Sequence, residues 1–395
     1  MLKDIIILKL DVLQILLIIY FLIAAIYYWV FAVAGNFYKN KTLQKSTKFN
    51  KIAILIPAYR EDNVIVNTTL KALNLNYPAT FFDVFIIADH LQSETIHQLK
   101  QTTAHIIELY LEKSSKAKAI NEAMKFIEDD KYTICLILDA DNHAESDFLL
   151  KINDAFESGS QIIQTHRTAK NLNTNFAVLD AISEEINNHL FRKAHRVFGL
   201  PATLIGSGMA FPYLLFKKLI SNAKTSFEDK EIEFMILKKG LMIDYLNDAI
   251  VFDEKIQNSS AFSRQRIRWV YSQIYFFSQY FFKSLPAFVN RKFKGLAIRG
   301  FSTALPPRII LLTFSFILSL IYLIIEPFST YFYLWIITFL TSVLTILISI
   351  PKKFYKLKTI KSLISLPLAA IMMIKAIILS KKAKNDFMHT KHTGA

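Results

Sequence analysis

IAILIPAYRED, residues 52–62, is a short apolar run that ends at Pro57 and is followed at once by polar side chains. An unbroken apolar run of this length is typical of a strand that is buried on both faces of a parallel sheet. The pattern recurs along the chain, with strands predicted at 83–88, 105–109 and 133–138 and helices at 64–73 and 116–127. Strands and helices that alternate at this spacing predict βαβ units, and therefore an α/β domain with a mostly parallel sheet.

Acidic residues stand where these predicted strands end. Glu61 follows the first strand, Asp89 the second, and Asp139 and Asp141 the fourth. Ligands of such sheets bind beyond the carboxyl ends of the strands. Two carboxylates around one residue can hold Mg²⁺ or Mn²⁺, which often share their oxygen ligands with substrate phosphates. An isolated Asp-x-Asp is a weak signal because loops are rich in Asp, but the position after a buried strand favours a metal site here.

Two later motifs also carry groups of chemical interest. FEDKE, residues 227–231, opens a predicted helix, where its acids either complement the helix dipole or supply a general base, and the sequence leaves both readings open. SRQRIRW, residues 263–269, places Gln265, Arg268 and Trp269 on one face of a helix. Arginine binds phosphate and tryptophan offers a flat apolar surface, although a structural cation–π pair is the alternative.

The apolar residues indicate segments that cross a membrane. They make up 53% of the 395 residues and occur in blocks, the first at 15–34. This run is long enough to span a bilayer and too long for a signal-peptide core, so residues 1–35 are predicted to be an uncleaved anchor. Runs at 309–325 and 331–350 predict a hairpin within residues 301–350. A poorer run at 362–379 lies between Lys-rich flanks, which favours a helix in the membrane interface over a fourth span.

Charge and cysteine content restrict the remaining choices. Lys and Arg exceed Asp and Glu by 47 to 32, a formal charge of +15, and no nucleic-acid motif accompanies it, so anionic lipid is the expected partner. One cysteine excludes a disulfide scaffold and a Cys-rich zinc site. Positive residues favour the cytoplasmic side of the cell's inner membrane. The expected order is a cytoplasmic domain at 36–269, an interfacial amphipathic region at 270–300 and a basic tail region at 351–395.

Taken in order, these motifs resemble the membrane-bound family 2 glycosyltransferases with a GT-A domain, the group of cellulose, hyaluronan and poly-N-acetylglucosamine synthases. The similarity runs from about residue 51 to 269, and residues 387–390, FMHT, faintly resemble a C-terminal gating segment. The resemblance implies a nucleotide-sugar donor site formed by Pro57, Tyr59, Glu61, Asp89, Lys116, Asp139, Gln265 and Arg268. It implies an acceptor site at Gly206, Ser207, Gly208 and Trp269, a Mg²⁺ or Mn²⁺ site at Asp139 and Asp141, and catalysis by Asp229 with Glu228 beside it.

The resemblance also implies a reaction. A sugar would pass with inversion from a nucleotide sugar, of the UDP type, to a saccharide or lipid-linked acceptor at the membrane, giving a β-linkage in polysaccharide or glycolipid biosynthesis. A nucleotidyltransferase would also use a nucleotide-binding sheet and acidic metal ligands, but it gives no reason for Trp269 beside Arg268. A non-catalytic transport or scaffold subunit would leave the separate aspartates unexplained. Three or four membrane segments are few for a polymer channel, so repeated addition does not follow.

Overall fold

The computed structural model describes residues 2–380, with side chains from residue 11 onward. An eight-stranded sheet in the order β3-β2-β1-β4-β7-β6-β8-β5 forms the centre of the α/β domain. The strands are β1 (Ile52–Tyr59), β2 (Phe82–Asp89), β3 (His105–Leu109), β4 (Ile134–Ile137), β5 (His143–Ala144), β6 (Ile163–Ala169), β7 (Met209–Pro212) and β8 (Asp244–Asp253). The four strands expected from the sequence are therefore confirmed. Pro57 lies inside β1 rather than at its end. Proline has no N–H to donate, but β4 pairs only with residues 52–55 of β1, so the missing N–H of Pro57 breaks no hydrogen bond to β4.

The sheet is parallel in one half and mixed in the other. β3, β2, β1 and β4 run parallel, as do β6 and β8, whereas β7 is antiparallel to both of its neighbours and β5 is antiparallel to β8. The expected parallel pattern therefore describes the half that contains β1. The reversal at β7 was not expected, since residues 209–212 carry no periodicity of their own that separates them from the preceding loop.

Helices cover both faces of the sheet and bury alternate residues of each strand. Ile52, Ile54 and Ile56 belong to one core, while Ala53 and Leu55 belong to the other, as the two-residue repeat of a strand requires. The first core includes residues of α2 (Ile65–Leu73), α3 (Ser93–Lys100) and α5 (Phe148–Glu157), with η1 (Ala79–Phe81) before β2. The second includes residues of α4 (Lys116–Ala123), α8 (Tyr213–Ile220) and α9 (Glu228–Lys238).

A second group of helices connects the sheet to the apolar segments. It consists of α6 (Asn175–Asn188), η2 (His189–Lys193), α7 (Ala194–Val197), α10 (Ser259–Ser284), η3 (Leu285–Phe288), η4 (Arg291–Phe293) and α11 (Lys294–Ser302). The expected domain boundary between residues 269 and 270 falls within α10, which is continuous. Its aromatic stretch packs on α9, where the rings of Tyr280 and Phe234 stack with centroids 3.9 Å apart.

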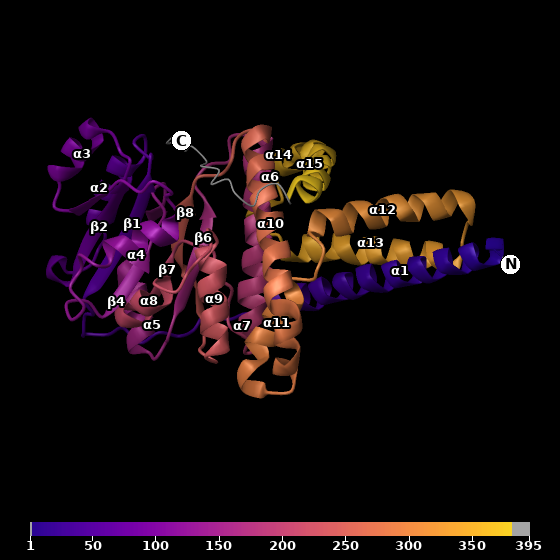
Figure 1. The fold of residues 1–395 in the computed structure, drawn as a ribbon, viewed down its shortest axis with the longest axis horizontal. Helices are drawn as coiled ribbons and strands as arrows, with labels where there is room; N and C mark the ends of the chain where they lie inside the picture. Colours follow the sequence, from indigo (N-terminus) through magenta and orange to yellow (C-terminus); the bar gives the residue numbers. More distant parts are fainter. Residues whose placement is uncertain (1, 381–395) are drawn as a thin grey trace.

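Three long helices project from the domain side by side (Figure 1): α1 (Leu2–Gly35), α12 (Arg308–Ile325) and α13 (Thr330–Ser349). Aromatic side chains fill the centre of this bundle, since the ring of Phe21 lies 5.2 Å from that of Phe314 and 5.7 Å from that of Trp335. Four segments of the described chain are long and apolar enough to cross a membrane, namely 11–35, 308–325, 330–349 and 357–379.

The fourth of these segments differs from the other three. After η5 (Lys352–Phe354) it is divided into α14 (Leu357–Ser362), η6 (Leu363–Ser365) and α15 (Leu366–Leu379). A helix of the length of α15 extends only about 21 Å, less than the ~30 Å hydrocarbon core. Figure 1 shows α15 nearly end-on, across the direction of α1, α12 and α13, and it packs against α10. This arrangement favours the interfacial helix expected from the sequence, which stays a prediction. The segment FMHT at 387–390 lies outside the described residues.

Candidate functional site

A cavity of about 1230 Å³ begins at the carboxyl ends of β1, β2 and β4 and extends to α12, α13 and α15. It brings together nearly all of the side chains that the sequence singled out, from seven separate parts of the chain. Those that line it are Pro57, Tyr59, Glu61, Asp89, Lys116, Asp139, Asp141, Gly206, Glu228, Asp229, Gln265, Arg268 and Trp269. Ser207 and Gly208 do not line it, because they lie beneath its floor, where Ser207 is fully buried.

Lys116 occupies the centre of the polar end. The Ser115 hydroxyl accepts the N–H of Lys118 and caps α4, which makes Lys116 the first residue of that helix. Lys116 Nζ donates to Asp139 Oδ1 at 2.5 Å and to the carbonyl oxygen of Gly206 at 2.6 Å, and it lies 3.7 Å from Glu228 Oε1. One ammonium group therefore connects the end of β4 with the start of α9.

Asp229 faces the same point from the other side of the Gly206 loop. A Cβ added to Gly206 would lie 3.8 Å from both Asp229 Oδ2 and Lys116 Nζ, so the two groups flank this glycine closely. Glu228 and Asp229 stand in the first turn of α9, where acids complement the helix dipole. The two readings of the FEDKE motif are thus compatible, because the same acids that suit the helix start also face the cavity.

Burial and neighbouring charges shift the pKa values of Glu228, Lys116 and Lys230. Burial raises the pKa of Glu228 to about 7, with Lys116 opposing the rise and Asp229 adding to it. Burial also opposes the charge of Lys116, but Asp139, Glu228 and Asp229 together outweigh it and raise the pKa of Lys116 above its usual value. Burial lowers the pKa of Lys230, the residue after Asp229, to about 8. A site with such opposed shifts can exchange protons near neutral pH.

The loop that carries Asp139 is held from below. The backbone N–H of Asp139 donates to Ser207 Oγ at 3.1 Å and to Asn142 Oδ1 at 3.3 Å. Gly208 belongs to the loop that carries Ser207, and it must be glycine because its φ is +63° and a Cβ there would overlap the hydroxyl of Thr165. Ser207 therefore positions the Asp139 loop directly, and Gly208 fixes the loop that carries Ser207.

Asp139 and Asp141 fit a divalent cation that arrives with phosphate. Both line the cavity, and Asp141 is oriented by the N–H of Glu254, which donates to its Oδ2 at 2.9 Å. Among residues 2–380 no group of three or more His, Cys, Asp or Glu side chains is arranged to hold a metal ion. Two carboxylates suffice for Mg²⁺ or Mn²⁺ when substrate phosphates supply further oxygens. The donor set thus suits a substrate-bound cation better than a permanent structural metal.

At the polar end of the cavity, Asp89 is fixed by its neighbours. Its carboxylate accepts the N–H of Leu111 at 3.2 Å, lies 2.6 Å from His90 Nδ1 and accepts the hydroxyl of Ser114. His90 and Arg60 both have positive φ, +58° and +54°, directly after β2 and β1. Such backbone conformations are costly for residues other than glycine and are often found at functional sites.

The motif on α10 presents its polar side chains to the cavity. Gln265, Arg268 and Trp269 all line it, and Gln265 Oε1 is buried with no hydrogen-bond partner among the described residues. A structural cation–π pair with Trp269 is also present, and Arg266 forms it. The guanidinium of Arg266 lies 4.0 Å from the Trp269 ring centroid and pairs with Asp180. Burial lowers the pKa of Arg268 while Glu228 and Asp229 oppose this, which places Arg268 within electrostatic reach of the acidic pair.

The structure adds an ion network that the sequence reasoning missed. Arg167 Nε donates to Glu184 at 2.7 Å, and Arg167 Nη1 lies 3.9 Å from Asp139 and 3.8 Å from Asp253. Lys255 pairs with Asp253 at 2.7 Å and with Glu184. Arg167 and Asp253 stand near the ends of β6 and β8, so the rule that led to Asp89 and Asp139 would have found them had these strands been recognised.

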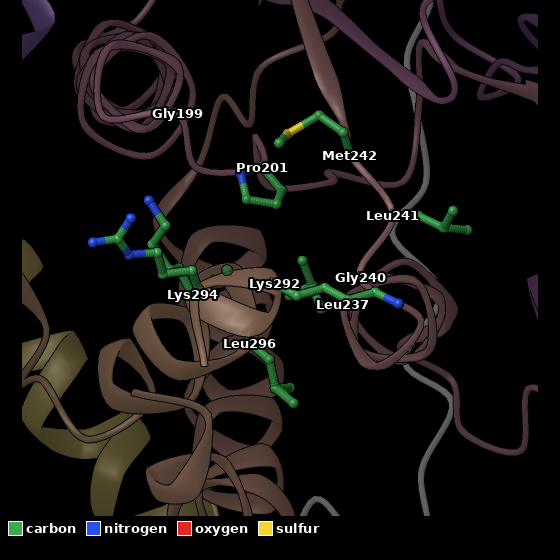
Figure 2. Close-up of a pocket in the computed structure, with 11 residues that line it drawn as sticks. Gly199, Pro201, Leu237, Gly240, Leu241, Met242, Lys292, Lys294 and Leu296 are labelled. Carbon is green, nitrogen blue, oxygen red and sulfur yellow. The ribbon is translucent and has the colours of Figure 1, made fainter. Parts of the chain in front are cut away.

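A second cavity, of about 50 Å³, lies beside Gly240 at the end of α9, where Pro201, Met242 and Lys292 meet (Figure 2). This space is far smaller than the large cavity and too small for a nucleotide sugar. None of the candidate site residues lines it. The large cavity is therefore the candidate active site.

Comparison with known proteins agrees with this geometry. Residues 50–272 match the family described as glycosyltransferase like family 2. A beta-monoglucosyldiacylglycerol synthase of Trichormus variabilis is 25% identical over 241 residues, which are 58% of this chain and 50% of that protein. The probable glycosyltransferase YdaM of Bacillus subtilis is 23% identical over 279 residues, 64% of this chain and 65% of that protein. The chain thus spans between half and two thirds of these relatives.

A solved structure also resembles most of this chain. It is the mannosyltransferase PcManGT of Pyrobaculum calidifontis, in complex with GDP-Man and Mn²⁺, with a TM-score of 0.54 and 13% identity. The match covers 86% of this chain and 99% of that one. At this identity the likeness shows a shared fold, the GT-A type.

Proposed function

The chain belongs to glycosyltransferase family 2, and from that premise we propose that it is an inverting enzyme that transfers a sugar from a nucleotide sugar, first of all a UDP-sugar, to an acceptor at the membrane. The observation that carries the proposal is the single cavity lined by Asp89, Asp139, Asp141 and Asp229. The bridge that Lys116 forms between Asp139 and Glu228 supports it further.

The residues suit a single displacement. Asp229 accepts the proton of the acceptor hydroxyl as its oxygen bonds to the anomeric carbon, and the bond from that carbon to the diphosphate breaks. Arg268 and Gln265 bind the departing diphosphate, where fixed positive charge is worth several kcal/mol to the transition state. A Mg²⁺ or Mn²⁺ ion held by Asp139 and Asp141 would neutralise further negative charge. Attack from the face opposite the leaving group gives a β-linkage from an α-linked donor.

The surroundings of the site support a membrane acceptor. The cavity continues from the catalytic carboxylates into apolar side chains of α12, α13 and α15. Two relatives are named for the synthesis of a diacylglycerol glycolipid. We therefore place the enzyme in glycolipid or lipid-linked saccharide synthesis at the inner membrane, with the α/β domain in the cytoplasm. On this proposal, the chain shares the GT-A domain with cellulose and hyaluronan synthases but does not make a long polymer.

A donor screen with the purified chain tests the proposal. UDP- and GDP-sugars are incubated with membrane lipid and Mn²⁺, and the free nucleotide and the product mass are measured together. Release of nucleoside diphosphate with a product one hexose heavier is expected. A nucleotidyltransferase would release pyrophosphate instead. No release from any donor would contradict the proposal.

A further inference from the structure

The lining of the large cavity changes along its length. Beyond the acidic end, side chains from α9, α10 and the start of α12 add cations, and the far end is apolar. The apolar part includes Leu312, Leu347, Ile350, Leu363, Leu366 and Met373, from α12, α13 and the residue after it, η6 and α15. These segments belong to the candidate membrane spans, so a lipid tail suits the apolar end by position as well as by chemistry.

Two cations of the middle part hydrogen-bond to uncharged oxygens, although Asp229 and Glu233 favour the charge of Lys230. Arg308 donates to the carbonyl oxygen of Ser183 at 3.3 Å, and Lys230 donates to Ser272 Oγ at 2.8 Å. Among the described residues, neither forms an ion pair with Asp or Glu. By contrast, Arg266 and Arg299, which line the same part, pair with Asp180 and Glu233.

The charge of Arg308 is further disfavoured by its position. It is the first residue of α12, at the positive end of the helix dipole, and it lies near enough to Arg266 for the two to repel each other. A bound anion with several oxygens would stabilise the charge of an arginine in such surroundings. Phosphate suits this role because its oxygens can accept paired hydrogen bonds from the guanidinium.

On the basis of the proposed function, we infer that the acceptor is a phospholipid with a free headgroup hydroxyl. Its tail lies between α13 and the segment η6–α15, its phosphate contacts Arg308, and its hydroxyl reaches Asp229. The hydroxyl oxygen bonds to the anomeric carbon, the proton passes to Asp229, and the electron pair of the broken bond leaves with the nucleoside diphosphate. The lipid phosphate keeps its own bonds and serves only for recognition. A neutral diacylglycerol would fill the tail site but leave Arg308 without an anion.

Three acceptors separate the contributions of tail and phosphate. Phosphatidylglycerol carries both, diacylglycerol only the tail, and glycerol phosphate only the phosphate. Transfer to phosphatidylglycerol in mixed micelles should exceed transfer to diacylglycerol by about tenfold, the effect of one charge-assisted hydrogen bond, with no product from glycerol phosphate at equal concentration. Equal or faster transfer to diacylglycerol would overturn the phosphate contact, and efficient transfer to glycerol phosphate would overturn the tail site.

Variants of Arg308 test the contact directly. Arg308→Gln should bring the ratio of the two lipid rates close to one by slowing transfer to phosphatidylglycerol alone, and Arg308→Lys should restore part of the preference. Arg264→Gln, at an exposed residue of α10 that does not line the cavity, is the control and should keep the full preference. An unchanged ratio in Arg308→Gln would contradict the assignment.

Two leucines provide a matched pair for the tail site. Leu363 and Leu368 are each 45% exposed, but only Leu363 lines the cavity. Leu363→Gln should raise the KM for phosphatidylglycerol about tenfold while Leu368→Gln leaves it unchanged, and equal effects would refute the tail site. Slow hydrolysis of the donor without acceptor reports folding and donor use. If the donor is hydrolysed and neither lipid accepts sugar, this inference fails and the proposed function stands. If no donor is used at all, both fail.

Discussion

Lys116 Nζ lies 2.5 Å from Asp139 Oδ1, a salt bridge that joins the first residue of α4 to the loop after β4. The same ammonium lies 3.7 Å from Glu228 Oε1. Residues far apart in the sequence therefore share one cation, and the carboxylates assigned to metal binding and to proton transfer belong to one electrostatic unit. The predictions below test the members of this unit and the membrane arrangement around it.

Asp229→Asn should abolish sugar transfer and preserve donor binding. The amide occupies nearly the same volume but cannot accept the proton, so we expect a fall in kcat of about 10³-fold, within the range for loss of a general base. Nucleotide release with acceptor measures transfer, and calorimetry with the nucleoside diphosphate measures binding. Normal transfer by this variant would show that another group is the base.

Glu228→Gln should change how stability depends on pH. The native pKa of Glu228, about 7, lies above its usual 4.5, so the folded chain holds a proton there that the unfolded chain has lost. This favourable term is complete below pH ~4.5 and disappears as the pH rises through 7. Between pH 5 and pH 8 the parent chain should therefore lose about 1–3 kcal/mol more of its free energy of unfolding than the variant does.

Denaturation in detergent at the two pH values measures that difference. Glu122→Gln, at a half-buried residue of α4 that does not line the cavity, is the control and should leave it unaltered. Parallel pH profiles for the parent chain and Glu228→Gln would mean that Glu228 is ionised throughout this range.

Asp141→Asn should weaken the binding of the nucleotide sugar in the presence of Mn²⁺ and have little effect in its absence. The substitution removes one anionic oxygen donor while retaining an acceptor for the N–H of Glu254. Titration calorimetry with and without Mn²⁺, before and after chelation, measures the difference. Equal losses in both conditions would indicate a structural role for Asp141 and no metal contact.

Gly208→Ala should cost more stability than Gly199→Ala. Both glycines have a similar positive φ, +63° and +66°, so the backbone cost of an alanine, about 1 kcal/mol, is shared. Only at Gly208 does the added Cβ overlap a neighbour, the hydroxyl of Thr165, while the space at Gly199 is open. Thermal unfolding of the two variants should therefore differ by several degrees. Equal melting temperatures would show that the loop of residues 206–208 can shift freely.

The interfacial assignment of α15 predicts that both of its flanks lie on one side of the membrane. Cysteines introduced at Lys361 and at Lys382 should react with an impermeant reagent from the cytoplasmic side, and a cysteine at Glu326, between α12 and α13, should react only from the other side. Cys135 is buried and gives a low background. Labelling of 361 and 382 from opposite sides would establish a fourth span.

The first half of the sheet could be predicted from the sequence, because its strands are continuous apolar runs such as Ile52–Ile56 and Ile134–Ile137. The second half could not. β7 has four residues and lies antiparallel, and the two-residue β5 is recognisable only by its pairing with β8. These strands are determined by tertiary contacts, and local patterns carry no signal for them.

The candidate site was predictable to the extent that its residues follow recognisable strands or motifs. Asp89 and Asp139 satisfy this condition, and Arg167 and Asp253 do not, since their strands were not recognised. The depth of Ser207 could not be read from the sequence either. Ser207 is fully buried and lies between two glycines with positive φ, Gly206 at +83° and Gly208 at +63°. A loop motif shows that a segment is special without showing which side chain meets the substrate.

Phe21, Phe314 and Trp335 pack together at the centre of the three-helix bundle. A polysaccharide that is extended and exported by the same enzyme needs a hydrated passage through the bilayer, and here aromatic rings occupy the space between the three helices. We therefore expect each catalytic cycle to end with a single added sugar, and the finished molecule to diffuse away within the leaflet in which it was made.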